Sequence, residues 1–477
     1  MRGPPENSVL FINPSTPGNR KITRNTDCAS ESKGNYLLQP FDFLSLSGAF
    51  GADTQIHFID AVADRLSDSA CFERIALLKF RLVIVAIVDL TWTRDYQFIS
   101  ELRNKYPEMA ILAFGDALIE DESAKKLNSI VDGIVVSPFL FKPGKVDCWT
   151  REAFQRVDRA ACGLRTETSY SGTCKKPVLC DLGPPRHELF KHVRYRWPFS
   201  RYKKYTTVTA TWGCPYSCSY CTSSRLPPLY RDHTSIVEEL RMIKALGIRE
   251  IYFGDKSFGI PVENTTKLLE GMIREKMSFS WSTYLHPRQA TPAFLRLMKE
   301  AGCHTIITGI ETSAPGRLQR FGRSIGEGQI EKVLQAAKEA GLQVCGDFLL
   351  GLPGENEDDI LATIDYSLRL ALDYASFNIV APLPGSSIKA LAVSEGRMRA
   401  DDHHFDSVGG SNVLGSALVS AERLQRLRNQ AVVGFYLRPG YLLRRVLGVR
   451  GWEHFQLQLA EAFELLFKVL KPKRRSV

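Results

Sequence analysis

Short runs of apolar residues alternate with amphipathic stretches through the first third of the chain. The apolar runs are rich in Val, Ile, Leu and Phe and are bounded by polar turn residues, at 8–14, 54–59, 82–88, 110–114 and 131–136. Such runs predict buried parallel strands. Helical patterns lie between them, within 37–51 and at 96–106. Strands alternating with helices predict a Rossmann-like, doubly wound α/β domain over residues 1–145.

The same alternation begins again after Tyr205 and continues to about residue 400. Six apolar runs predict strands, at 206–211, 250–253, 279–284, 305–310, 344–350 and 375–381. Helical patterns separate them, starting at 234 and near 264, 291, 325 and 356. Six strands with connecting helices predict a partial (β/α)6 barrel over 204–400, with its chemistry at the carboxyl ends of the strands.

The remaining segments predict less regular structure. Residues 146–203 carry scattered Pro, Gly, Lys and Arg, which predicts an irregular linker packed across both domains. Residues 401–477 predict a helical C-terminal region, with helical patterns at 421–437, 441–446 and 452–470.

The chain has 477 residues and a formal net charge of +10, which suits an anionic ligand or surface without identifying one. No apolar run reaches the length of a membrane span, and the N-terminus lacks the apolar region of a signal peptide, so we expect a cytoplasmic protein. The basic tail at 468–475 is either a solvated terminus or a peripheral contact with an acidic membrane surface.

Three cysteines follow the first predicted barrel strand, in Cys214-Pro-Tyr-Ser-Cys218-Ser-Tyr-Cys221. Three thiolates at this spacing can hold three irons of a [4Fe–4S] cluster and leave the fourth iron open. A structural zinc site would need a fourth ligand nearby. The nearest candidate is His233, twelve residues after the last cysteine and outside any zinc-ribbon pattern, so the spacing favours iron and sulfide.

This loop, with Tyr220 before its last cysteine, resembles the signature of the radical S-adenosylmethionine (radical SAM) superfamily, and the resemblance extends over residues 200–400. It implies a [4Fe–4S] cluster, S-adenosylmethionine, and an external electron donor of the flavodoxin or ferredoxin type. It also implies that the reduced cluster cleaves S-adenosylmethionine to methionine and a 5′-deoxyadenosyl radical.

Two further loops are similar to family motifs that bind the methionyl group and the ribose. Gly254-Asp255 follows the second barrel strand where the family commonly has Gly-Gly-Glu, which implies that Asp255 binds the methionyl ammonium. Glu311, after the fourth strand, is implied for the ribose hydroxyls or the substrate amine, and Arg323 for the methionyl carboxylate. The alternatives are that Asp255 caps the next turn and that Arg323 is a solvated residue at a helix start.

Two later turns are similar to family turns that lie along the adenine. Gly351-Leu-Pro-Gly-Glu355 follows the fifth strand, and Pro382-Leu-Pro384-Gly-Ser follows the sixth. The resemblance implies that Gly351 and Pro384 shape the adenine side of the cleft, while we expect Glu355 to cap the next helix. The sequence identifies no general acid or base.

The N-terminal domain resembles the cobalamin-binding domain that precedes the barrel in many family members. The shared features are Asn13-Pro14, Gln39-Pro40 and Asp60. There is no Asp-x-His-x-x-Gly motif, so a histidine ligand to cobalt is not supported, and the usual Gly-Gly is replaced by Gly115-Asp116. The resemblance implies cobalamin, and the alternative is a domain that only shapes the substrate cleft. Residues 434–441 resemble the helical cap of the subgroup containing anaerobic magnesium-protoporphyrin cyclase.

The leading hypothesis is a cobalamin-dependent C-methyltransferase that acts on an unactivated carbon of a natural product, lipid or tetrapyrrole. The alternative within the family is a cyclase, oxidase or rearrangement enzyme. A tRNA methylthiotransferase would need a second cluster and a terminal β-barrel, but Cys28, Cys71 and Cys148 are too dispersed for that cluster. A non-catalytic iron–sulfur protein is the remaining rival. We therefore expect a small or lipid-like substrate rather than a nucleic acid.

Overall fold

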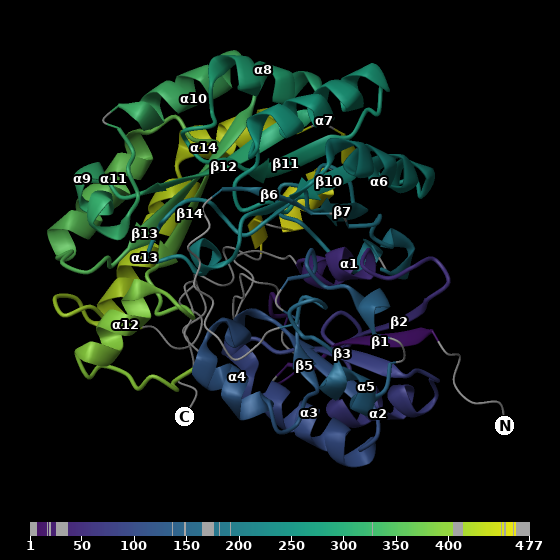
Figure 1. The fold of residues 1–477 in the computed structure, drawn as a ribbon. Helices are drawn as coiled ribbons and strands as arrows, with labels where there is room; N and C mark the ends of the chain where they lie inside the picture. Colours follow the sequence, from purple (N-terminus) through teal and green to yellow (C-terminus); the bar gives the residue numbers. More distant parts are fainter. Residues whose placement is uncertain are drawn as a thin grey trace.

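The computed structural model describes most of the chain. The described residues are 7–16, 18, 21–24, 37–135, 137–146, 149–164, 176–180, 182–190, 192–326, 328–403, 414–449, 451–452, 455–460 and 462–463. A five-stranded parallel sheet and a six-stranded parallel sheet form two layers of the molecule, with helix α1 (Phe41–Ser47) between them (Figure 1).

The N-terminal sheet has the order β2-β1-β3-β4-β5 and is parallel throughout. Its strands are β1 (Ser8–Asn13), β2 (Gln55–Asp60), β3 (Leu82–Ala86), β4 (Ala110–Phe114) and β5 (Gly133–Ile134). Every residue of β1, β3 and β4 is buried, because the sheet is covered on both faces. The other helices of this part are α2 (Asp68–Ala76), α3 (Trp92–Lys105), α4 (Asp121–Leu127) and α5 (Arg151–Arg156). The doubly wound α/β prediction is confirmed.

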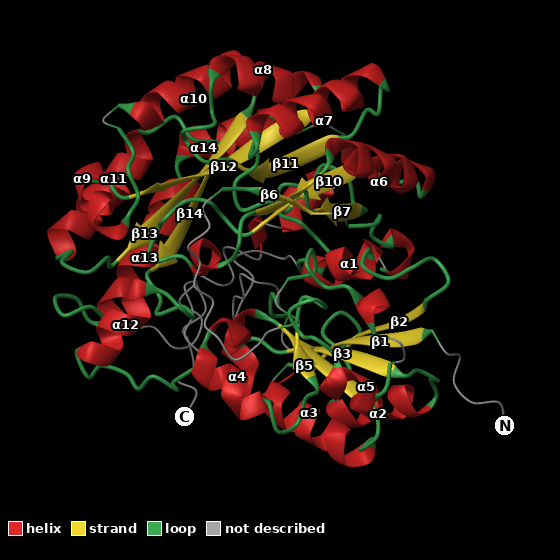
Figure 2. Ribbon diagram, viewed as in Figure 1, coloured by secondary structure: helices red, strands yellow, loops and turns green. Residues whose placement is uncertain are grey.

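The six-stranded sheet has the order β14-β13-β12-β11-β10-β7, so each strand pairs with its predecessor in the barrel. Its strands are β7 (Tyr205–Val208), β10 (Glu250–Phe253), β11 (Ser280–Tyr284), β12 (Cys303–Glu311), β13 (Gln343–Leu350) and β14 (Tyr374–Ile379). Helices cover its outer face (Figure 2), and an apolar core fills the space between them and the sheet. This is the predicted partial barrel.

The helices of the barrel are α6 (His233–Ala245), α7 (Val262–Arg274), α8 (Pro292–Glu300), α9 (Pro315–Leu318), α10 (Gln329–Glu339), α11 (Glu357–Arg369) and α12 (Ser387–Ser394). Helices α6, α8, α11 and α12 begin at side-chain caps, which are Asp232, Thr291, Asn356 and Ser386. Asn356 and Asp359 form a capping box at α11. Helix α10 begins four residues later than the predicted start near 325, because Gly328 adopts a left-handed φ of 65° at its N-cap.

The predicted linker is more ordered than its composition indicates. It contributes α5 and a short strand, β6 (Val178–Cys180), which pairs with β9 (Leu229–Arg231). Strand β9 also pairs with β8 (Thr211–Trp212), and together they form a third small sheet. A three-residue, largely exposed strand has no hydrophobic period, which is why the sequence pattern missed it.

Side chains from both large sheets meet at the interface between them. Gln39 Oε1 accepts a hydrogen bond from the Thr207 amide at 2.8 Å, and the Gln39 amide donates to Tyr205 Oη at 2.8 Å. Lys389 Nζ, at the start of α12, lies 2.6 Å from Glu120 at the start of α4. These contacts hold the barrel, at β7 and at the start of α12, against the N-terminal domain.

The C-terminal region is helical where it is described. Helix α13 (Ala421–Tyr436) packs on β14, and Tyr436 Oη donates to the Ala375 carbonyl at 2.7 Å. Helix α14 (Pro439–Leu447) follows. Residues 455–460 are helical as predicted, whereas the end of the predicted helix at 464–470 lies outside the described residues.

Candidate functional site

The loop with the three cysteines leaves the first barrel strands and packs under neighbouring loops. The Ser219 amide donates to the Phe321 carbonyl at 2.8 Å, and the Ser387 amide donates to the Ser219 carbonyl at 2.7 Å. A Cβ on Gly322 would collide with the Ser217 carbonyl, so the glycine allows the close approach of the two loops. The cysteine loop is thus held from two sides at the carboxyl ends of the strands.

The three thiols form a group that suits an iron–sulfur cluster. Burial, together with the neighbouring thiols of Cys221 and Cys218, raises the pKa of the Cys214 thiol to about 12. Among the described residues, no three His, Cys, Asp or Glu side chains converge on one metal ion. A [4Fe–4S] cluster does not need such convergence, because each thiolate binds a different iron. Three sulfur donors without a carboxylate therefore fit a cluster better than a single hard cation.

Glu311, Arg323 and Tyr220 lie together beside Cys218. Arg323 Nη2 is 3.5 Å from Glu311 Oε1 and donates to the Gly309 carbonyl at 2.6 Å. Tyr220 Oη donates to Glu311 Oε1 at 3.3 Å, and Arg323 Nη1 lies 3.8 Å from Cys218 Sγ. The sequence predicted these residues separately, and the fold brings all of them to the end of β12.

Glu311 is held in an unfavourable backbone conformation. Its φ is 69°, in the left-handed region that non-glycine residues rarely adopt. Burial raises the pKa of its carboxyl, while the charge of Arg323 opposes this shift. Arg323 is itself buried, which excludes the alternative of a solvated arginine. A strained, buried carboxylate with a cationic partner is typical of a functional site.

Asp255 is fully buried at the end of β10, and one of its oxygens has no partner. Its Oδ1 accepts hydrogen bonds from the amide of Thr211 and from Thr211 Oγ1, the latter at 2.8 Å. Its Oδ2 makes no hydrogen bond within the described part of the chain. Burial raises the pKa of Asp255 to about 7, against the hydrogen bonds from Thr211. These bonds run back to β8, so Asp255 is not a cap of the following turn. A Cβ on Gly254 would lie 2.9 Å from Thr207 Cγ2, so a glycine at this position lets the loop pack closely against β7.

The turns after β13 and β14 face the helices and the N-terminal domain. Glu355 Oε2 accepts from the amides of Gly351 and Leu352, both at 2.9 Å, and so closes its own turn. Gly351, with a φ of 85°, lies against Leu424 of α13. The Pro384 carbonyl accepts from Thr222 Oγ1 at 3.2 Å, directly after the cysteine loop.

The sequence patterns did not predict an aromatic pair at the other side of the cysteine loop. The rings of Tyr216 and His286 stack with their centroids 3.9 Å apart, and Tyr216 Oη donates to Gln289 Oε1 at 2.6 Å. Burial and the charges of Arg323 and Arg288 lower the pKa of His286 to about 3, so its ring is neutral. Its position just after β11, at the carboxyl ends of the strands, is the signal that identifies it.

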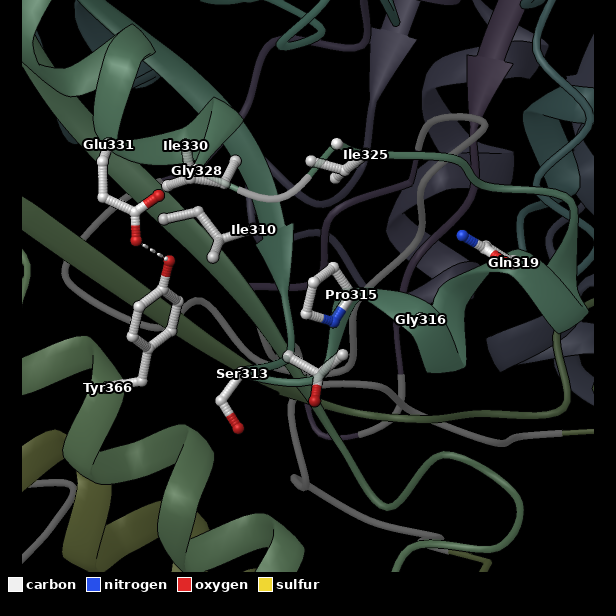
Figure 3. Close-up of a pocket in the computed structure, with 12 residues that line it drawn as sticks. Ile310, Ser313, Pro315, Gly316, Gln319, Ile325, Gly328, Ile330, Glu331 and Tyr366 are labelled. Carbon is white, nitrogen blue, oxygen red and sulfur yellow. Dashed lines mark hydrogen bonds between the residues drawn. The ribbon is translucent and has the colours of Figure 1, made fainter.

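A cavity of about 430 Å³ lies beside this site (Figure 3). Its walls include Ser313, Pro315 and Ile330, and Tyr366 Oη donates to Glu331 Oε1 at 2.7 Å at its edge. None of the site residues predicted from the sequence lines it. The cavity is therefore separate from the group around Glu311.

Comparison with known proteins identifies the barrel. Residues 208–367 match the model of the radical SAM superfamily. An uncharacterised methyltransferase of Pyrococcus horikoshii is 28% identical over 281 residues, which cover 57% of this chain and 60% of that protein. The chain thus matches less than two thirds of the length of this relative.

Two solved structures share the fold of nearly the whole chain. The methyltransferase TsrM from Kitasatospora setae, solved with cobalamin and a [4Fe–4S] cluster, superposes with a TM-score of 0.60 at 17% identity, covering 82% of this chain and 75% of its own. OxsB, solved with aqua-cobalamin and S-adenosylmethionine, gives a TM-score of 0.62 at 12% identity, covering 97% and 72%. These two structures show that the fold is shared, and the family model identifies residues 208–367 as a radical SAM domain.

Proposed function

We propose that this protein is a radical SAM enzyme that methylates an unactivated carbon, with cobalamin, in a natural-product, lipid or tetrapyrrole pathway. The observation that carries the proposal is the cysteine loop with Glu311 and Arg323 packed beside Cys218. Cys214, Cys218 and Cys221 would hold three irons of a [4Fe–4S] cluster. When bound and reduced, this cluster supplies the electron that cleaves S-adenosylmethionine to methionine and a 5′-deoxyadenosyl radical.

Two buried polar atoms suit the two charges of the methionyl group. Asp255 Oδ2 has no hydrogen-bond partner within the described chain and can accept from the ammonium. Arg323 Nε is a buried donor with no partner among the described residues, and it can donate to the carboxylate. Glu311 would then accept from the ribose hydroxyls. Leaving these atoms without a ligand would cost free energy, which supports a polar ligand in this place.

Cobalamin, when bound, supplies the methyl group from cobalt. Its place is supported by the shared fold and by Trp212, whose buried Nε1 has no hydrogen-bond partner among the described residues. Trp212 packs on Phe114 of the N-terminal sheet with ring centroids 6.1 Å apart, so this donor lies between the two domains. Doubly wound sheets bind ligands where the strand order reverses, which here is between β1 and β3. The Arg24 side chain occupies this position and bonds to Asn13 and Thr91. We therefore assign the cofactor to the interface at Trp212.

The test is a metal count after anaerobic reconstitution with iron, sulfide and hydroxocobalamin, followed by desalting. We expect about four irons and about one cobalt per chain. Trp212→Phe should retain less cobalt at unchanged iron, because it removes the donor and keeps an aromatic ring. Four irons without cobalt would overturn cobalamin-dependent methyl transfer and leave the cyclase or oxidase alternative.

A further inference from the structure

The C-terminal region exposes an unusual amount of apolar surface. The described residues contain seventeen large hydrophobic side chains that are exposed, and eight of them lie between Leu442 and Phe463. Soluble domains rarely gather exposed apolar side chains in this way unless the surface binds something.

In α14 the exposed apolar residues form one stripe. Leu442, Leu443, Val446 and Leu447 are 47%, 61%, 69% and 76% exposed. At 3.6 residues per turn these four side chains fall within an arc of about 140°. Tyr441 points inward, where its ring centroid lies 5.5 Å from that of Phe435. The stripe is therefore the outer face of a docked amphipathic helix.

The next segment repeats the pattern. Trp452, Phe455, Leu459 and Phe463 are all exposed, and their spacing of three, four and four residues places them within an arc of about 80° of a helix. The Arg196 side chain holds this segment to the protein by donating to the Leu457 carbonyl at 2.7 Å. A second group of exposed apolar side chains thus lies on an anchored segment after α14.

The charges around these stripes indicate which surface they meet. Residues 437–477 contain nine Lys or Arg and three Glu, and so carry six of the ten excess positive charges of the chain. Arg444 is exposed beside the stripe of α14. The positive charges lie on both sides of the second segment, with four Arg at 438–450 and five Lys or Arg at 468–475, whereas 451–464 carries three Glu. The apolar stripe of α14, with arginines on its own helix, has the composition of helices that lie in the interface of an anionic bilayer. A partner protein would not require this excess of positive charge.

The position of α14 leaves the candidate active site accessible. Arg445 Nη1 donates at 2.7 Å to the hydroxyl of Tyr374, the first residue of β14. The helix therefore lies at the amino ends of the barrel strands, whereas the cysteine loop lies at their carboxyl ends. No helix among the described residues is long and apolar enough to cross a membrane. We propose that the apolar stripe of α14, together with Trp452, Phe455, Leu459 and Phe463, binds the surface of an anionic lipid bilayer.

The experiment measures co-sedimentation of the full chain with vesicles of phosphatidylcholine, alone or with phosphatidylglycerol. We expect binding to the anionic vesicles, weakened by salt, and at least about tenfold weaker binding by the triple variant Leu443→Gln, Val446→Gln, Leu447→Gln. Leu77→Gln is the matched control, because Leu77 is 84% exposed in the N-terminal domain.

Trp452 reports where the protein touches the lipid. It is 71% exposed, whereas the other five tryptophans are all less than 9% exposed. The tryptophan fluorescence of the protein should shift to shorter wavelength when anionic vesicles are added. The triple variant should show no such shift. The proposal is overturned if the triple variant binds as Leu77→Gln does, or if the emission does not shift. It is also overturned if light scattering shows a dimer that the triple variant abolishes, because the face would then belong to a second copy.

Discussion

At the scale of single residues, the site depends on charged groups that the fold has removed from water. The side chains of Glu311 and Arg323 are 10% and 9% exposed, and each lies within reach of the other. Isolated charges at this depth would be very unfavourable, and Arg323 opposes the rise that burial causes in the pKa of Glu311. Asp255 has no such cation in direct contact within the described part of the chain. Burial therefore raises the pKa of its carboxyl without a neighbouring positive charge in contact to offset it.

Removing one member of the buried pair should be costly. We expect Glu311→Ala to lower the free energy of unfolding by about 3 kcal/mol, because Arg323 would be left buried without a carboxylate. The control is Glu331→Ala, which removes an exposed carboxylate from the same region and should cost about 0.5 kcal/mol or less. Chemical denaturation measures both, and equal losses would contradict a buried pair.

The raised pKa of Asp255 predicts a pH dependence of stability. The folded carboxyl has a pKa of about 7, whereas that of an aspartate in the unfolded chain is 3.8, so the folded state binds more protons than the unfolded state between these values. The free energy of unfolding should therefore fall as the pH rises from about 4 to 7.

Asp255→Asn keeps the side chain neutral and should remove this part of the decline. We expect the stability advantage of the variant to grow by about 3 kcal/mol between pH 4 and pH 7. Denaturant titrations at pH 4, 5, 6 and 7 give the slope. Parallel curves for the wild type and the variant would show that Asp255 is ionised throughout.

At the scale of elements, the positions of the strands could be predicted more reliably than the contacts made by the side chains at their ends. The apolar runs located β4 and β10 to the residue, because a central parallel strand is buried on both faces. The same patterns gave no sign that Glu311 adopts a left-handed φ or that Arg323, twelve residues later, returns to it. Such contacts arise from loop geometry and have no hydrophobic period.

Near the end of β12, Gly309 leaves no room for a larger side chain. A Cβ on this residue would collide with Glu311 Oε1 and Arg323 Nη2. We expect Gly309→Ala to displace the pair and weaken binding of S-adenosylmethionine at least about tenfold, by calorimetry on the reconstituted protein. Gly316→Ala, in α9 nearby, has no neighbouring atom within 4 Å of the added Cβ and should bind normally. Equal affinities would show that the pair does not contact the ligand.

At the scale of the whole molecule, the interface between the two sheets positions the mouth of the barrel. Gln39, singled out in the sequence as part of a family motif, turns out to bond to β7. The linker was predicted to pack across both domains. In it, the Arg186 amide donates to Ser47 Oγ of α1 at 2.8 Å, and His187 bonds to Thr206 of β7 at 2.7 Å. Its strand β6 was not predicted, because a local pattern of apolar residues does not reveal pairing between segments that are distant in the sequence. The two domains and the linker therefore meet at one interface beside the barrel.

The ion pair between Glu120 and Lys389 tests this interface. The two side chains are 18% and 6% exposed, so Glu120→Ala should destabilise the chain by about 2 kcal/mol in denaturant unfolding. Glu122→Ala, two residues away, removes a pair whose side chains are 63% and 65% exposed and should cost about 0.5 kcal/mol or less. If the two variants lose the same stability, the contact does not hold the domains together.

The most direct test of the proposed chemistry is the formation of 5′-deoxyadenosine by the reconstituted, reduced protein with S-adenosylmethionine. The wild type should produce it, and Cys218→Ala should not, because one iron would lose its ligand. Cys303→Ala is the matched control, since Cys303 is buried in the barrel core and outside the loop, and it should retain the activity. Production by Cys218→Ala, or none by the wild type with about four irons bound, would contradict a radical SAM enzyme.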